Sequence, residues 1–286
     1  MTNAYVSLDT LKSSSVLNVT GTADDSRLRA LAENASRIVD RYCNRHFYVV
    51  VATRRFDGLG TRSRLALLVP DLVSIDAGGL KTDDDRDRVF ETTWAASDYL
   101  LLPTNADPAA GGISQSRPYV EVAVDVDAGT KSAFPSGMQT VQIAGQWGWW
   151  RHLRRATETA NAVADTTTTS VTVSSRADVE AGHTLLIDSE QMYVLSYAAS
   201  TLTVVRGVNG TTAASHSGAA AIDIYEYPGP IVEATIIQAT RLWRRKDSAF
   251  GGSGGLPGTG QTRVSAGLDP DVALLLGQYR KLSVGA

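Results

Sequence analysis

Apolar residues recur along this chain with two different periods, and the change of period divides the sequence. A spacing of three and four residues begins after Thr22-Ala23-Asp24-Asp25, a capping-box pattern, and predicts an amphipathic helix that ends near Asn44. The predicted apolar stripe of this helix consists of Leu28, Leu31, Ala35, Ile38 and Tyr42. A shorter helix is predicted over residues 7–15, with Ser7 as its N-cap.

From Phe47 to about Gly148 the pattern changes to apolar runs and two-residue alternation, which is typical of half-buried strands. The breaks between the runs carry Gly, Pro, Asn and Asp. The predicted strands cover residues 49–51, 65–69, 73–75, 119–124 and 140–144, and Pro70 separates the second from the third.

A second β-rich stretch is predicted from about Ser170 to Tyr227, after a transition segment over residues 152–166 and a polar connector. Its strands are short and closely spaced, which favours a small barrel or sandwich. Gly207, Asn209 and Gly210 predict a turn with positive φ angles. The strands are expected at residues 171–173, 183–187, 191–197, 202–205 and 220–225.

The last third of the chain returns to helical spacing. Pro230 at a first helical position predicts a helix with a stripe of Val232, Ile236, Ala239 and Trp243 and with cationic last turns. A Gly-rich linker follows over residues 251–267, and a terminal helix is predicted over 268–286. The apolar face of that helix is too wide for a short tail to bury alone, so we expect it to dock on another protein. Its docking candidates are Val272, Leu275, Leu276, Tyr279 and Leu282, and Leu274 widens the same face.

Composition and charge restrict the function classes. Hydrophobic residues make up 43% of the 286 residues and charged residues 20%, as in ordinary globular proteins. We expect no secretory signal and no membrane span, because the N-terminus has no apolar core and no apolar run is long enough. The net charge of −3 argues against a dedicated duplex-binding domain. Cys43, the one cysteine, lies in a helical pattern and is expected to be a small buried group.

Catalytic patterns are weak in this sequence. We find no phosphate-binding loop, no dinucleotide fingerprint and no pair of histidines at metal-ligand spacing. Asp188 and Glu190, two residues apart and expected on one face of a strand, are the only candidate pair of carboxylates for acid–base chemistry. Three adjacent acids at residues 83–85 are expected to form a solvated loop, with a weak calcium signal. The sequence therefore predicts a protein that is not an enzyme and uses no cofactor or metal.

The aromatic cluster Trp147-Gly148-Trp149-Trp150 has two interpretations. The rings can anchor the core at the end of a strand, or they can form a subunit interface together with Arg151 and Arg154. These arginines and Arg155 could also contact DNA phosphates, although the negative net charge argues against that.

Several stretches together resemble the head-to-tail connector (adaptor) proteins of long-tailed phages. The helix end over residues 38–47 is similar to an "I-D-x-Y-C-x-R-x-F" pattern, and residues 141–149 are similar to a "V-x-I-x-G-x-x-G-W/Y" strand. No single motif is diagnostic, but their order and spacing are moderately specific and cover about two-thirds of the chain. The other matching stretches are residues 5–12, 24–28, 68–75, 94–101 and 228–243.

The resemblance implies an α+β fold in which residues 1–151 and 228–250 form a helical adaptor core with a β-sheet portion. Residues 182–194 and 205–216 look like a β-module that recurs in phage structural proteins, so residues 152–227 are interpreted as an insertion. The implied assembly is a twelve-subunit ring in the virion neck, put together in the host cytoplasm. The portal protein lies above the ring, a stopper or tail terminator lies below, and DNA crosses the lumen.

The sequence leaves open a further partner of the ring and a second function. The capsid is a further possible partner of the ring, and DNA is expected to pass without sequence-specific binding. The alternative function is a tail or baseplate subunit whose β-module binds host surface glycans. That alternative requires exposed aromatic rings on the module, where the available tyrosines are Tyr193, Tyr197, Tyr225 and Tyr227.

Overall fold

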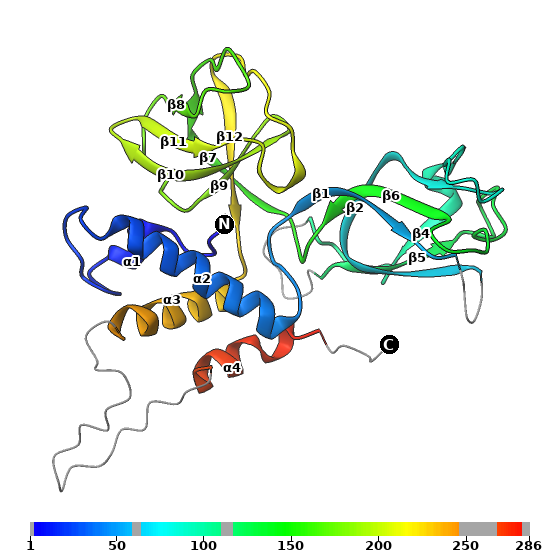
Figure 1. Cartoon of the computed structure of the whole chain (residues 1–286), viewed down its shortest axis with the longest axis horizontal. Coiled ribbons are helices and arrows are strands. Elements are labelled where there is room, and N and C mark those ends of the chain that lie inside the picture. Colours follow the sequence, from blue (N-terminus) through cyan, green and yellow to red (C-terminus); the bar gives the residue numbers. More distant parts are fainter. Residues whose placement is uncertain (1–2, 59–63, 110–116, 246–267, 282–286) are drawn as a thin grey trace, which may run out of the picture. The chain divides into compact units, whose positions relative to one another are not determined.

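The computed structural model describes residues 3–58, 64–109, 117–245 and 268–281, and it has the predicted α+β class (Figure 1). It contains two antiparallel sheets and few helices. The helices are α1 (Leu8–Lys12), α2 (Asp25–Cys43), α3 (Gly229–Arg244) and α4 (Pro270–Leu276), with 3-10 turns η1 (Ala96–Asp98), η2 (Val208–Gly210) and η3 (Gly277–Tyr279). The strands are β1 (Val50–Phe56), β2 (Ala66–Thr82), β3 (Thr92–Thr93), β4 (Tyr99–Leu102), β5 (Tyr119–Val124), β6 (Val141–Trp147), β7 (His152–Ala160), β8 (Ser170–Thr172), β9 (Thr184–Ile187), β10 (Glu190–Ala198), β11 (Thr201–Val205) and β12 (Ala220–Glu226).

The chain forms two compact units. The first contains residues 1–44, 154–208 and 212–286, and the second contains residues 45–153 and 209–211. The helices α1 to α4 thus belong to the same unit as the sheet that begins with β7, whereas the sequence interpretation grouped most of them with the first sheet. These two units are defined by contacts between residues, whereas the predicted domains were defined by resemblance to a family. The predicted domain borders therefore stay a prediction.

The sheet of the second unit has the order β1-β6-β2-β5-β4, and β3 pairs with β2. Its buried face includes Leu72, Val122 and Ile143, and Trp94 stacks on Phe134 with ring centroids 4.7 Å apart. The predicted break at Pro70 is wrong, because Pro70 lies inside the long strand β2. The pairing of β2 with β5 shifts register between Leu68 and Leu72, and a proline without an N–H is tolerated at such an irregularity.

The sheet of the first unit has the order β7-β12-β9-β10-β11-β8. Its two outermost strands are also joined, because Asn161 N donates to Thr172 O over 2.8 Å and an isolated bridge links Ala160 to Val173. Side chains from all six strands form one apolar cluster, including Leu185, Ile187 and Ile222. Residues 207–210 make the predicted turn, with φ angles of 58° at Gly207, 57° at Asn209 and 81° at Gly210.

Strand β7 is missing from the sequence prediction, which read residues 152–166 as a transition segment. Its inward positions are Ala156, Glu158 and Ala160, all buried, and the outward positions between them are polar, starting with the exposed Arg155. Small side chains and an acid on the inner face give no alternation of large apolar residues, so the strand has no visible signature.

The helix α2 ends as predicted, with Asn44 in the left-handed conformation at φ 53°. Its start differs from the prediction. Asp24 is the N-cap and makes no side-chain capping hydrogen bond, so the capping box is wrong. The buried face is also rotated from the predicted stripe, because Leu31, Ile38 and Tyr42 are only half-buried. The buried residues are Leu28, Ala32, Ala35, Ser36, Val39 and Cys43. Cys43 is fully buried, as expected.

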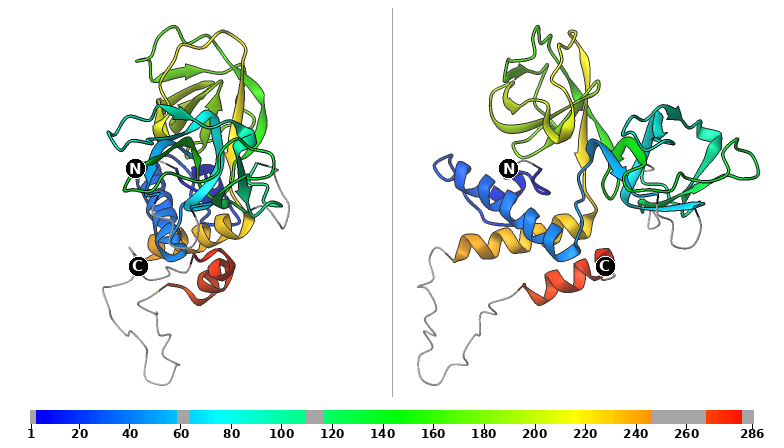
Figure 2. Two further views of the ribbon diagram at one scale, coloured as in Figure 1. Left: turned by 90° about the vertical axis from the view of Figure 1, so that its right-hand side faces the viewer. Right: turned by 45° about the vertical axis from the view of Figure 1, so that its right-hand side comes forward.

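Helix α3 packs against α2 on one side and α4 on the other (Figure 2). Pro230 lies in its first turn, as predicted. Of the predicted stripe, Ala239 and Trp243 are buried, whereas Val232 and Ile236 are half-buried. This partial exposure leaves one side of α3 open for the groove described below.

Candidate functional site

The terminal helix α4 is largely covered by its own chain. Val272 and Leu276 are fully buried, so the expectation that these two residues are open for docking is wrong. Leu275 and Tyr279 are half-buried, and Leu282 lies outside the described residues. A short tail was expected to find no partner surface in its own subunit, but α2 and α3 supply one.

The attachment of α4 to α2 is specific. Lys281 N donates to Cys43 O over 2.8 Å, and the Arg280 guanidinium lies 5.6 Å from the centroid of the Tyr42 ring. Leu274 points away from this attachment and is 82% exposed. It is the apolar residue of α4 that remains available for a second protein.

The tryptophan cluster divides into a core residue and residues near the surface. Trp147 is fully buried in β6, and its indole Nε1 donates to Ala52 O over 2.8 Å, so its ring is unavailable to a neighbouring subunit. Trp149 is half-buried and carries the Arg45 guanidinium 4.4 Å from its ring centroid. Trp150 is also half-buried and lies beside His152, with 5.5 Å between the ring centroids.

The two arginines that follow this cluster are engaged in different ways. Arg151 Nη1 donates to Gln146 Oε1 over 3.1 Å. Arg154 forms ion pairs with Asp178 over 2.8 Å and with Glu226 over 2.7 Å. Two carboxylates beside Arg154 neutralise its charge locally, which disfavours a role in binding DNA phosphates.

The carboxylates of Asp188 and Glu190 differ in their exposure to solvent. Asp188 adopts a left-handed turn conformation at φ 53° and its side chain is 62% exposed, whereas Glu190 is fully buried. Asp188 lies in the turn between β9 and β10, so the expectation that both residues lie on one strand is wrong. Both nevertheless contact His216, through Nδ1 to Asp188 over 2.7 Å and through Nε2 to Glu190 over 2.9 Å.

Glu190 is saturated with hydrogen bonds. Arg206 donates to both of its oxygens over 2.7 Å each, and the backbone amides of Gly207 and Ala214 donate over 2.9 Å. Burial alone would raise the pKa of Glu190, but these donors, led by Arg206, lower it to about 2. A carboxylate with this many donors has no lone pair left for acid–base work. The network therefore fastens residues 206–216 to β10. The roles of Arg206 and His216 in it were not predicted from the sequence.

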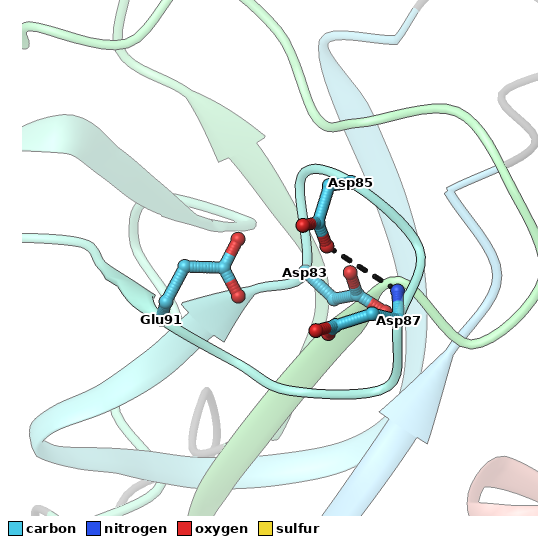
Figure 3. Close-up of side chains that lie close together, drawn as sticks. All are labelled: Asp83, Asp85, Asp87 and Glu91. Atoms are coloured by element: carbon cyan, nitrogen blue, oxygen red, sulfur yellow. Dashed lines mark hydrogen bonds between the residues drawn. The ribbon is translucent and has the colours of Figure 1, made fainter.

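The acidic segment 83–91 forms a compact loop (Figure 3). Oxygen atoms of Asp83, Asp85, Asp87 and Glu91 all lie within 4.8 Å of one another. The expectation of a wholly solvated loop is wrong for Asp83, which is fully buried and accepts hydrogen bonds from the backbone amides of Arg86 and Arg88 over 2.6 and 2.9 Å. The other three acids are exposed.

A groove of about 820 Å³ runs along the open side of α3, within the first unit. Its apolar lining includes Val16, Ile236 and Ile237. Its charged lining is mixed and consists of Arg241, Arg244, Arg245, Glu233 and Asp269. From the sequence, these arginines were expected only to stabilise the helix dipole. Their spacing of three and four residues already places them on the helix side that carries Ile237.

A smaller cavity of about 250 Å³ lies between residues 4–10 and β12. His183 and Arg154 are part of its lining. Burial, followed by the nearby Arg154 charge, lowers the pKa of His183 to about 4, so the imidazole is neutral at pH 7. Its Nδ1 accepts a hydrogen bond from the Glu180 amide over 3.1 Å, which identifies the tautomer with the proton on Nε2.

Known proteins add no assignment. No family model, curated protein or solved structure matches this chain. Among the described residues, no helix has both the length and the apolar character of a membrane-spanning segment.

Proposed function

We propose that this chain is a connector subunit of the neck of a tailed-phage virion. In this proposal, copies of the chain form a ring, twelve-membered in the resembling family, between the portal vertex and the tail, and DNA passes through the ring. The first support is the ordered set of stretches that resemble the connector family, above all residues 38–47 and 141–149.

The observation that carries the proposal is the exposure of Leu274 on the surface of α4. Helix α4 follows the Gly-rich stretch, is anchored by the fully buried Val272 and Leu276, and presents Leu274 at 82% exposure between them. Single exposed leucines are common. This one stands on a helix whose orientation is fixed by its neighbours, so it offers a preformed contact to the portal protein.

The finer fold assignment belongs to the same proposal. Residues 152–227 would be a small barrel inserted into the adaptor fold, and the hydrogen bonds that join β7 to β8 support a closed arrangement. The helices and the sheet that begins with β1 would form the adaptor core. A stopper or tail terminator would bind below the ring, the capsid is a further possible neighbour, and no membrane is involved.

The glycan-binding alternative has less support. Tyr193 is fully buried and Tyr225 is 6% exposed. Tyr197 carries the Arg176 guanidinium 3.7 Å from its ring centroid and donates its hydroxyl to Asp9 over 2.8 Å. Sugar recognition by stacking needs an open ring face, and these three tyrosines are covered or already used.

A catalytic role has no support from the candidate carboxylates. Glu190 is buried and saturated by donors, and its neighbour His216 is held between two carboxylates. We therefore propose a structural role, with no cofactor.

The substitution Leu274→Asp in the full chain tests the proposed portal contact. We expect binding to the portal protein to weaken by at least roughly tenfold, because a buried leucine contact contributes about 1.5–3 kcal/mol. The measurement is interferometry on immobilised portal. Val126→Asp is the matched control, since Val126 is an exposed apolar residue of the other unit at 58% exposure. Equal binding of wild type and Leu274→Asp, with an unchanged circular dichroism spectrum, would remove the portal assignment of α4.

A further inference from the structure

Arg54 is a half-buried residue of β1 whose guanidinium has no acceptor within the described ranges of the chain. Its strand position faces the same side as Ala52 and Phe56, which pack against the apolar core of the second unit. Among the described residues, none accepts a hydrogen bond from this guanidinium or forms an ion pair with it. A guanidinium carries five N–H donors, so a partly buried one without an acceptor favours a ligand that supplies oxygen atoms.

An aromatic ring fixes the position of this guanidinium. Arg54 lies 4.5 Å from the centroid of the Trp147 ring, which is fully buried and is held by its hydrogen bond to Ala52 O. The Phe56 ring lies beside Trp147, with 5.8 Å between the ring centroids. Stacking on a ring occupies the flat face of a guanidinium and leaves its N–H edge for a planar partner. Apolar surroundings also make a charge pair stronger than it is in water.

The charge around Arg54 is unbalanced. Burial lowers the pKa of the Arg54 guanidinium, and the nearby Asp71 carboxylate only partly offsets this effect. Asp71 is itself buried and already engaged, because its Oδ2 lies 3.5 Å from Arg45 Nη1. Two arginines thus share one carboxylate, and these three side chains together keep one positive charge.

We propose that Arg54 binds the carboxylate group of a ligand that reaches the second unit from solvent. A carboxylate supplies one negative charge, which balances the three side chains, and its two oxygens match the N–H edge of a guanidinium. The inference goes beyond the proposed connector function, because the site lies on the second unit and involves no residue of α4.

Two sources offer the same chemistry at Arg54. One is a free organic acid, and the other is an acidic side chain of a neighbouring copy of this chain. A phosphodiester also carries one negative charge, but it comes as part of a polyanion. The net charge of −3 opposes the approach of a polyanion, so we infer a carboxylate.

An acetate titration of the full-length chain tests this site, with sodium chloride exchanged for sodium acetate at constant ionic strength. The reporter is the NMR signal of the Trp147 indole Nε1–H, because this ring carries Arg54 and is present in every variant. We expect a saturable shift of this signal in wild type. Arg54→Gln should lower the affinity for acetate by at least roughly tenfold, because it removes the charge and the paired donors.

Two further variants make the result specific to the Arg54 guanidinium. Arg55→Gln is the matched control, because Arg55 is exposed on the opposite side of the strand and lies 5.0 Å from the centroid of the Phe90 ring. It should bind acetate like wild type. Arg54→Lys keeps the charge without the planar edge and should lose about three- to tenfold in affinity. Circular dichroism checks folding, and Arg54→Lys decides the case if Arg54→Gln unfolds.

Three results overturn the site. These are a Trp147 signal that responds to acetate no more than to chloride, an Arg54→Gln chain that binds like wild type, and an equal loss in Arg55→Gln. Dimethyl phosphate is the second titrant. If it saturates the signal and acetate does not, the site takes a phosphodiester and the carboxylate assignment is wrong.

Sedimentation velocity without portal protein distinguishes the two sources of the carboxylate. Self-association that is weakened both by acetate and by Arg54→Gln identifies an acidic side chain of a neighbouring copy. A wild-type chain that binds acetate and stays monomeric identifies a free organic acid. Neither result depends on portal binding, which Leu274→Asp tests separately.

Discussion

Glu190 shows how one buried acid can organise a loop. Its side chain is fully buried, and its donors come from three places along residues 206–216, namely Arg206 with Gly207, Ala214 and His216. Removing one member of a buried charge cluster leaves the others without compensation and costs about 3–5 kcal/mol. The rigidity of this loop therefore depends on a residue that contributes nothing apolar to the core.

Glu190→Gln is expected to lower the free energy of unfolding by roughly 3 kcal/mol at pH 7, measured by urea denaturation. The pKa of Glu190 is about 2 in the folded chain and is ordinarily 4.5, so its contribution is complete above pH 4.5 and is lost as the pH falls toward 2. The difference between wild type and variant should therefore shrink over that window. Asp188→Asn is the control, because its side chain is 62% exposed, and should cost less than about 1 kcal/mol. A difference that stays constant from pH 7 to pH 2 would contradict the assignment.

At the residue scale, properties of single residues could be predicted from the sequence, but contacts between distant residues could not. The burial of Cys43 and the positive φ angles at Gly207 and Asn209 followed from residue type alone. The partners of Glu190 did not, because Arg206 and His216 are 16 and 26 residues away along the chain. Contacts of that separation are set by strand register, which a single sequence does not specify.

At the scale of elements, helix α4 combines an anchored face with an exposed one. The sequence pattern predicted this helix over residues 268–286, and in the structure the helix begins at Pro270. The width of its apolar face was read as evidence for an external partner alone. The structure assigns Val272 and Leu276 to the chain's own packing and leaves Leu274 exposed. Sequence periodicity reports which residues are apolar, but it cannot report which protein covers them.

Leu276→Ala and Leu274→Ala separate these two roles. Truncation of the fully buried Leu276 should destabilise the docked position of α4 by about 2–5 kcal/mol, because it removes apolar contacts and leaves a cavity. Truncation of the exposed Leu274 should cost less than about 0.5 kcal/mol. Hydrogen exchange of the α4 amides measures both. Faster exchange in Leu274→Ala than in Leu276→Ala would contradict the packing.

The accuracy of the strand predictions differed from strand to strand. The strands rich in large apolar residues, such as β5 and β6, were found close to their observed bounds. Strand β7 escaped because its inner positions carry Ala156, Glu158 and Ala160, and β2 was divided because Pro70 lies at a register shift. In both cases, pairing with neighbouring strands determined the observed strand, although the local sequence pattern did not indicate it.

At the scale of the whole molecule, the chain is divided into two compact units, and the helices α1 to α4 belong to the unit that contains most of the sheet beginning with β7. The sequence pattern predicted two separate β-rich stretches, but it grouped most of the helices with the first of them. The unit to which a helix belongs depends on tertiary contacts, which a single sequence does not specify.

The mass of the complex formed by the full-length chain and purified portal protein tests the connector assignment most directly. Native mass spectrometry should show one complex in which about twelve copies of the chain occupy one portal ring, the number that the resemblance to the connector family implies, held together by closed heterologous contacts. The Leu274→Asp chain should give no such complex at the same concentration. A wild-type chain that remains a free monomer beside intact portal rings would contradict the account.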